Sequence, residues 1–281
     1  MRRFLAGLGL AGVLALSGCS LIWPGSSSGE SGPSAPASDK YLEEYAERWC
    51  YKHLDSRLRE NYGAVYTAVK DSFGRDETVS IRDSSEGTAR EYSTGLEIQL
   101  PEALRSREEA KLIYTAFTWD NPQFFYIGNT YSYKGYRSGG VDYYDRFTLV
   151  FTMNAREREQ AQNKLERVVD RLVNSRADTG EFASELYFHD QLLEICSYDK
   201  NAAASDDPAQ LFPNAFSAYG ALVEGKAVCE GYSRAMQLLL HKAGIECTLV
   251  SGAGKKTGVA HMWNLVTIDG RNYHVDATWD D

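Results

Sequence analysis

The sequence predicts an α+β protein in which two folded parts follow an N-terminal leader and tether. Residues 40–175 contain both helix-periodic and strand-like segments. Apolar residues recur at helical spacing from about Cys229 to Ala243, where Gly244 stands in the position of a C-terminal cap. Downstream, the dipeptide Asp269-Gly270 separates two strand-like segments, which predicts an antiparallel hairpin.

The leader has the features of a bacterial lipoprotein signal. Arg2 and Arg3 precede a short apolar run over residues 4–16, and Leu16-Ser17-Gly18-Cys19 resembles a lipobox. The resemblance implies that residues 1–18 are a signal peptide and that lipid is attached to Cys19. An ordinary signal peptide ending near a cysteine is the alternative. The general secretory route fits better than a twin-arginine signal.

Residues 19–39 are expected to form the lipidated cysteine and a flexible tether, because Ser, Gly, Pro and Ala dominate the segment. The protein is therefore expected at the cell membrane, lipid-anchored and facing the extracytoplasmic side. Its net charge is −9, and no Lys/Arg cluster follows Arg3. This charge pattern argues against nucleic acid as a partner.

Residues 40–175 are expected to form an N-terminal α+β domain of unknown role. The expected helices cover residues 39–71 (broken at Gly63), 106–118 and 154–172, the last two opened by capping boxes. The expected strands cover 78–81, 91–100 (ended by Pro101), 124–133 and 146–153. A Tyr-rich stretch over 134–144 fits a long hairpin connection better than a sugar-binding platform.

Residues 176–281 carry the chemistry. Cys229 begins the predicted helix, where unpaired N–H groups and the helix dipole favour a thiolate. A small buried cysteine is the alternative. In the predicted helix 181–198, His189-Asp190 invites a catalytic interpretation, but a structural role for a helix packed on the Cys229 helix is favoured.

The predicted hairpin brings a histidine and an aspartate together. With a two-residue turn at Asp269-Gly270, Trp263 lies opposite Asp276 and His261 opposite Thr278. His261 and Asp276 then share one face as diagonal neighbours, while the other face looks apolar. Cys229, His261 and Asp276 thus have the order of nucleophile, base and orienting group.

Three motifs resemble the transglutaminase-like superfamily, a group of papain-like thiol enzymes. They are Gly225–Ser233 (GKAVCEGYS), His261–Val266 (HMWNLV) and Tyr273–Asp281 (YHVDATWDD). The resemblance covers roughly residues 181–281. It implies a papain-like transglutaminase core behind the smaller α+β domain, with Cys229 as nucleophile, His261 as base and acid, and Asp276 orienting His261.

The remaining cysteines and the metal-binding residue types predict little. Cys50, Cys196 and Cys247 allow at most one disulfide if Cys19 is lipidated and Cys229 is free. No Cys-x-x-Cys or His-x-x-x-His spacing occurs, and strand alternation explains His274-x-Asp276 more simply than a metal site. We therefore expect neither a metal nor another cofactor.

The expected function is that of an extracytoplasmic thiol enzyme acting on amide bonds through a thioester on Cys229. The substrate would be a protein or peptide, with cell-wall peptides one option. Hydrolysis and transfer share one triad, so the motifs leave peptidase, amidase and transglutaminase open, with a slight preference for hydrolysis. A non-catalytic surface binding or scaffold protein is the alternative. Family members usually continue through more strands after this motif, so we expect either that the domain is truncated at Asp281 or that its C-terminal edge is supplied differently.

Overall fold

The computed structural model describes residues 3–4, 8–10, 45–82, 89–177, 180–254 and 258–281. Cys19 and residues 20–39 lie outside these ranges, so lipidation and the tether stay predictions. Within the described part of the leader, β1 (Arg3–Phe4) and β2 (Leu8–Leu10) pair with strand β5 (Ile127–Ser138). No helix in the described ranges is both long and apolar enough to cross a bilayer.

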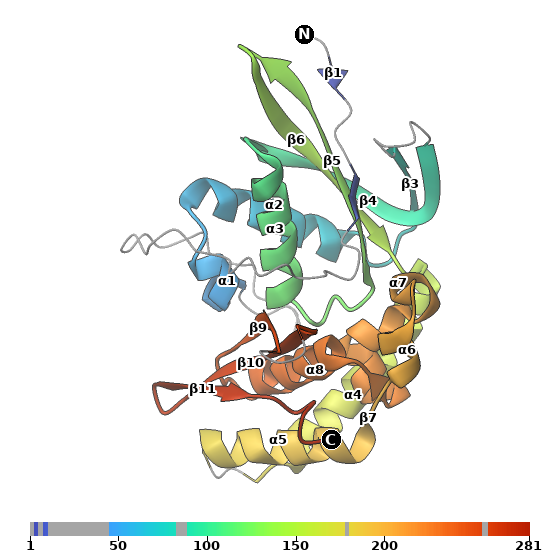
Figure 1. Cartoon of the computed structure of the whole chain (residues 1–281). Coiled ribbons are helices and arrows are strands. Elements are labelled where there is room, and N and C mark those ends of the chain that lie inside the picture. Colours follow the sequence, from blue (N-terminus) through green and yellow to red (C-terminus); the bar gives the residue numbers. More distant parts are fainter. Residues whose placement is uncertain (1–2, 5–7, 11–44, 83–88, 178–179, 255–257) are drawn as a thin grey trace.

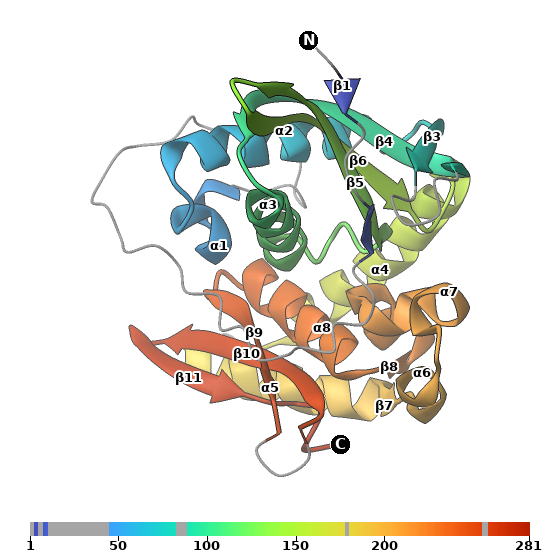
Figure 2. The same cartoon turned by 45° about the horizontal axis from the view of Figure 1, so that its top comes forward.

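The N-terminal part is an antiparallel sheet with helices packed against it (Figure 1). Figure 2 shows the sheet curving around α2 and α3. The strand order is β1-β5-β6-β4-β3. Besides β5, the elements are η1 (Tyr45–Glu47), α1 (Trp49–Lys52), α2 (Ser56–Asp71), β3 (Glu77–Arg82), β4 (Ala89–Leu104), α3 (Arg107–Asp120) and β6 (Val141–Phe151).

Three local expectations for this part were wrong. Gly63 lies inside α2, and the helix break falls earlier, at residues 53–55, where the Asp55 side chain caps α2 by accepting from Leu58 N. Strand β4 continues through Pro101, since the pairing with β6 is irregular there and needs no proline N–H. The Tyr-rich stretch is mostly strand, turning at Gly139-Gly140 with positive φ at both residues.

The C-terminal part surrounds helix α8 (Cys229–Lys242). One side of α8 packs on a sheet of order β11-β10-β9, while α5 packs beside it (Figures 1 and 2). Together the two parts confirm the predicted α+β class. The other elements are α4 (Ala155–Ser175), α5 (Glu181–Ile195), β7 (Ser197–Tyr198), α6 (Lys200–Ala204), α7 (Pro208–Leu211), η2 (Pro213–Phe216), η3 (Gly220–Glu224), β8 (Lys226–Ala227), β9 (Cys247–Ala253), β10 (Ala260–Ile268) and β11 (Arg271–Val275).

One continuous apolar core joins the two parts. Helix α4 follows the N-terminal sheet in sequence but packs on α8 and η3. Across the same contact, Tyr219 stacks on Phe125 with ring centroids 5.0 Å apart, and the Arg234 guanidinium on α8 donates to the carbonyl of Thr118 on α3. The N-terminal part therefore supports the helix that carries Cys229.

Asp120, at the end of α3, is a buried carboxylate that ties three helices together. It accepts hydrogen bonds from the backbone N–H groups of Cys50 (2.9 Å) and Tyr51 (2.8 Å) on α1 and from the Tyr62 hydroxyl on α2 (3.1 Å). Burial raises the pKa of Asp120 to about 6, although the hydrogen bonds from Cys50 and Tyr51 act in the opposite direction. The charged form thus costs stability at neutral pH, and these donors compensate only in part.

We expect Asp120→Ala to destabilise the protein by about 3 kcal/mol or more, because it leaves buried donors without an acceptor. Urea unfolding measures the change, and the exposed Asp71→Ala is the control, with less than about 0.5 kcal/mol expected. In the wild type, the charged Asp120 carboxylate lowers the free energy of unfolding above the folded-state pKa of about 6, and this loss of stability is relieved as pH falls through that value. The destabilisation by Asp120→Ala should therefore grow at mildly acidic pH, and equal unfolding midpoints for both variants would contradict this role.

Candidate active site

Cys229 is the first residue of α8, as predicted, and the backbone around it is tightly held. Val228, the N-cap, donates its N–H to the Ala215 carbonyl at 2.9 Å and provides no side-chain cap. The N–H groups of the first turn therefore lack a side-chain acceptor. Gly231 allows this close packing, since a Cβ there would lie 2.6 Å from the Ala215 carbonyl oxygen. Cys229 itself is partly exposed.

The hairpin that carries the histidine has the predicted turn and register. Asp269 and Gly270 have φ values of 49° and 72°, as a two-residue hairpin turn requires. Ile268 pairs with Arg271, and the ladder runs to Asn264 opposite Val275. The expected apolar face is only partly buried, because Tyr273 on the edge strand β11 is 46% exposed.

His261 and Asp276 meet as the sequence predicted. The His261 Nε2 atom lies 2.7 Å from Asp276 Oδ2, and both side chains are mostly buried. Hydrogen bonds to Asp276 and to Cys229 raise the pKa of His261 to about 9, against an opposing effect of burial. Because Asp276 occupies Nε2, the ring nitrogen left for the Cys229 thiol is Nδ1. The structure thus brings all three predicted site residues together.

Asn264 fixes the position of β10 relative to α8. Its side chain is 1% exposed, and Nδ2 donates to the Ser233 carbonyl at 2.9 Å and to Cys247 Sγ at 3.3 Å. Ser233 in turn donates its hydroxyl to the carbonyl of Cys229 at 2.8 Å. This chain of contacts links the strand of His261 to the helix of Cys229. Sequence reasoning missed Asn264, since a strand asparagine carries no positional signal.

The segment after Asp276 folds back over the site. The Trp279 ring stacks on His261 with centroids 5.0 Å apart and planes 16° apart, while Trp263 stacks at 5.9 Å and 23°. Asp280 Oδ2 lies 3.2 Å from His189 Nε2 on α5. His189 thus contacts this segment and the adjacent Asp190, as a structural role implies.

Two tyrosines near Cys229 were also missed. Asp281 accepts hydrogen bonds from the Tyr198 N–H at 3.0 Å and from the Tyr232 hydroxyl at 2.9 Å. Tyr198 packs in a small apolar cluster with Val228. Burial first, and then the charge of Cys229, raises the pKa of Tyr198, so its phenol keeps its proton. In contrast, Tyr219, which is close to Cys229 in sequence, is buried against Phe125.

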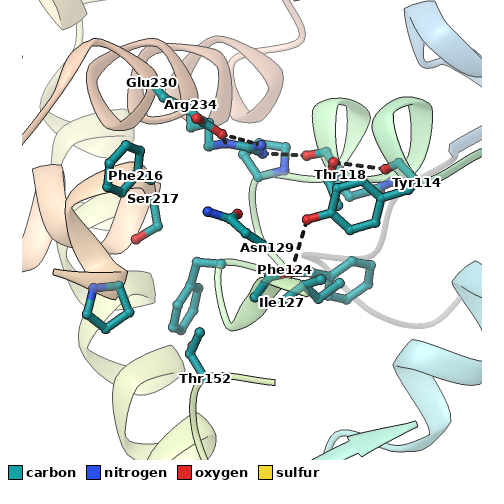
Figure 3. A pocket seen from close by; sticks show the side chains of 15 residues that line it. Tyr114, Thr118, Phe124, Ile127, Asn129, Thr152, Phe216, Ser217, Glu230 and Arg234 are labelled. Carbon is teal, nitrogen blue, oxygen red and sulfur yellow. Dashed lines mark hydrogen bonds and ion pairs between the residues drawn. The ribbon is translucent and has the colours of Figure 1, made fainter. Parts of the chain in front are cut away.

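A small pocket of about 40 Å³ opens where the two parts of the chain meet. Figure 3 shows Asn129 at its centre, with the Arg234–Glu230 ion pair (2.8 Å) of α8 on one side and Tyr114 on the other. Neither Cys229 nor His261 lines it. The pocket therefore lies beside the first turn of α8 and does not include the Cys229–His261 pair.

Cys50, Cys196, Cys229 and Cys247 are free thiols, and all but Cys229 are buried. Among the described residues, no group of three or more His, Cys, Asp or Glu side chains could hold a metal ion. Cys229 is thus the one cysteine among these four that is not buried.

Comparison with known proteins identifies a match over this part of the chain. Residues 166–277 match the family model of the Transglutaminase-like superfamily. The chain is 33% identical over 92 residues to Kyphoscoliosis peptidase of Mus musculus. That stretch is 29% of this chain, which spans only 13% of the length of that relative.

Solved structures give distant matches. A crystal structure of a TGase is 15% identical with a TM-score of 0.35, over 66% of this chain and 50% of that one. The periplasmic domain of TgpA from Pseudomonas aeruginosa is 15% identical with a TM-score of 0.29, over 50% of this chain and 57% of that one.

Proposed function

We propose that this chain, whose residues 166–277 match the family model of the Transglutaminase-like superfamily, is a thiol enzyme that acts on amide bonds through a thioester on Cys229. The observation that supports the proposal most is the His261 side chain. Its Nε2 atom lies 2.7 Å from Asp276 Oδ2, and a hydrogen bond to Cys229 contributes to its raised pKa, so Nδ1 is the ring nitrogen that remains for the thiol. This is the geometry of a thiol activated by an oriented imidazole.

The proposed first half-reaction forms the thioester. His261 takes the thiol proton on Nδ1, and the Cys229 thiolate attacks the carbonyl carbon of an amide. The backbone N–H of Cys229, in the first turn of α8, is placed to stabilise the resulting oxyanion. The C–N bond then breaks as His261 returns the proton to the leaving amine.

The second half-reaction regenerates the thiol. Either water or a second amine attacks the thioester carbonyl, His261 accepts the proton of the attacking group, and the thiolate leaves. Water gives a peptidase or amidase, and an amine gives a transglutaminase. We favour hydrolysis of peptides or proteins, with cell-wall peptides as one substrate. The leader and Cys19 support a lipid-anchored, extracytoplasmic enzyme.

The test of an activated thiol is the pH dependence of Cys229 alkylation by iodoacetamide in the full chain, followed at that residue by peptide mass spectrometry. At about pH 6 an ordinary thiol is almost fully protonated, so the wild type should react at least about tenfold faster than His261→Ala. At about pH 10 the two proteins should react alike. If both the wild type and His261→Ala are labelled slowly at about pH 6, the thiol is not activated, and a binding or scaffold role remains for the protein.

The same protein can then separate hydrolysis from transfer. Incubation with glutamine-containing peptides and a biotinylated alkyl amine should give deamidated or cleaved peptide if water is the acceptor. Incorporation of biotin into the peptide would assign transfer instead. Cys229→Ala is the control, because it keeps every binding residue and lacks only the nucleophile.

A further inference from the structure

The His261 ring is stacked against two indoles. The Trp279 centroid lies 5.0 Å from the imidazole centroid with the planes 16° apart, and the Trp263 centroid lies 5.9 Å away with the planes 23° apart. The two indoles come from different segments, since Trp263 belongs to β10 and Trp279 follows β11. We call Trp263 and Trp279 the indole pair.

Trp263 is in close contact at two of its edges. Its Nε1–H donates to His274 Nδ1 at 2.8 Å. Its six-membered ring lies directly over Gly252 of β9, where a Cβ atom would be only 2.8 Å from the ring. Since Gly252 pairs with His261 across the β9–β10 ladder, the missing side chain at residue 252 is what allows the indole to lie beside the histidine.

Trp279 is positioned in a different way. Its indole is 73% exposed, so burial contributes little to its location. The residues that follow it are anchored instead. Asp280 contacts His189 at 3.2 Å, and Asp281 accepts hydrogen bonds from Tyr198 N–H and the Tyr232 hydroxyl. These side-chain contacts anchor residues 280 and 281, and the exposed indole of the preceding residue lies on the imidazole.

We propose that the indole pair stabilises the imidazolium form of His261 and holds its ring plane, so that Trp263 and Trp279 are positioning residues for the Cys229–His261 ion pair. The proposal rests on the proposed function. Both centroid distances are within the roughly 6 Å over which an indole face attracts a cation. Each such contact strengthens the protonated form by about two- to fivefold.

The other groups around His261 act in the same direction or are already occupied. Asp276, after β11, and Cys229 of α8 both raise the pKa of His261. His274 of β11 is engaged by Trp263, and His189 of α5 by Asp190 and Asp280. Tyr198 of β7 keeps its proton, because burial and the charge of Cys229 raise its pKa. The two stacked indoles add to the effect of the carboxylate on the imidazolium.

The test compares alkylation of Cys229 by iodoacetamide in the full-length wild type, Trp279→Leu and Trp279→Phe. At about pH 6, Trp279→Leu should react about two- to fivefold more slowly than the wild type. Trp279→Phe should recover at least half of the lost rate, because a smaller aromatic face remains. At about pH 10 the three rates should agree, since a thiol there ionises without help from imidazolium.

Tyr273→Ala is the matched control, because Tyr273 is an exposed aromatic residue of the same hairpin, 46% exposed and on the opposite face. It should react like the wild type at both pH values. The high exposure of Trp279 means that its variants should fold, and urea unfolding checks this. If Trp279→Leu is nevertheless unstable, Trp279→Phe decides the question through the same ratio of rates.

Two results would contradict the proposed role of the indole pair. One is a rate for Trp279→Leu equal to that of the wild type at about pH 6. The other is an equal change at both pH values, which would mean that Trp279 controls only access to the thiol. A wild type that lacks fast labelling at low pH is a different outcome, since it contradicts the thiol enzyme itself.

Discussion

Cys229→Ala is expected to abolish turnover, reducing it by at least about 10³-fold, while the protein stays folded. The thiol is the group that forms the thioester, and none of the neighbouring side chains replaces it. Cys229 is partly exposed and its backbone is held through Val228 and Gly231, so removal of the sulfur should change the free energy of unfolding by less than about 1 kcal/mol.

The measurement pairs peptide turnover with urea unfolding of the same preparation. Cys229→Ser is the companion variant, and it should be equally inactive because a hydroxyl does not form an ion pair with imidazole at neutral pH. Retained turnover in either variant would remove Cys229 from the mechanism. A lowered unfolding midpoint would instead assign the loss to folding.

Two variants of Asp276 are expected to separate orientation from charge. Asp276→Ala removes the acceptor at Nε2, so His261 can adopt the wrong tautomer and ring angle, and turnover should fall by roughly 10²- to 10⁴-fold. Asp276→Asn keeps one carbonyl oxygen for the 2.7 Å contact but removes the negative charge. Asp276→Asn should therefore lose less turnover than Asp276→Ala, as long as its amide oxygen faces His261.

The imidazole selects that amide orientation, because a protonated Nε2 needs an acceptor and only the amide oxygen can accept its hydrogen. Asp276 Oδ1 is buried without a hydrogen-bond partner among the described residues, so the opposite position favours neither amide atom. In the wild type, activity should fall as pH rises through about 9, where His261 loses its proton. In Asp276→Asn this fall should move to lower pH, and an unchanged alkaline limb would show that Asp276 acts only through geometry.

The parts of the site that could be predicted from sequence are those set by local chemistry. Asp269-Gly270 takes positive φ at both residues, which sets the β10–β11 register and so places His261 near Asp276. Gly244 ends α8 with a positive φ of 75°, and its N–H bonds to His241 O. Each of these features depends on residues adjacent in sequence, so a pattern of a few letters identifies it.

The parts that could not be predicted depend on contacts between distant segments. Asn264 bonds to Ser233 on α8, and Trp279 reaches His261 only because residues 280–281 are anchored to α5, β7 and α8. The helix break predicted at Gly63 was wrong for a related reason, since contacts between distant segments decided it. A helix-interior glycine costs only about 1 kcal/mol, which the packing of α2 on the sheet exceeds.

The shared core has a consequence for genetics. Because one set of packed side chains runs from α1 to the β10–β11 hairpin, a substitution far from the Cys229 thiol disturbs the helix that carries it. A random mutagenesis screen for inactive protein would therefore recover substitutions in α2, α3 and β6 beside those in the triad. A second measurement, of protein abundance, would distinguish core substitutions from substitutions at the proposed triad. Second-site mutations that restore a destabilised core variant should arise anywhere in the shared core.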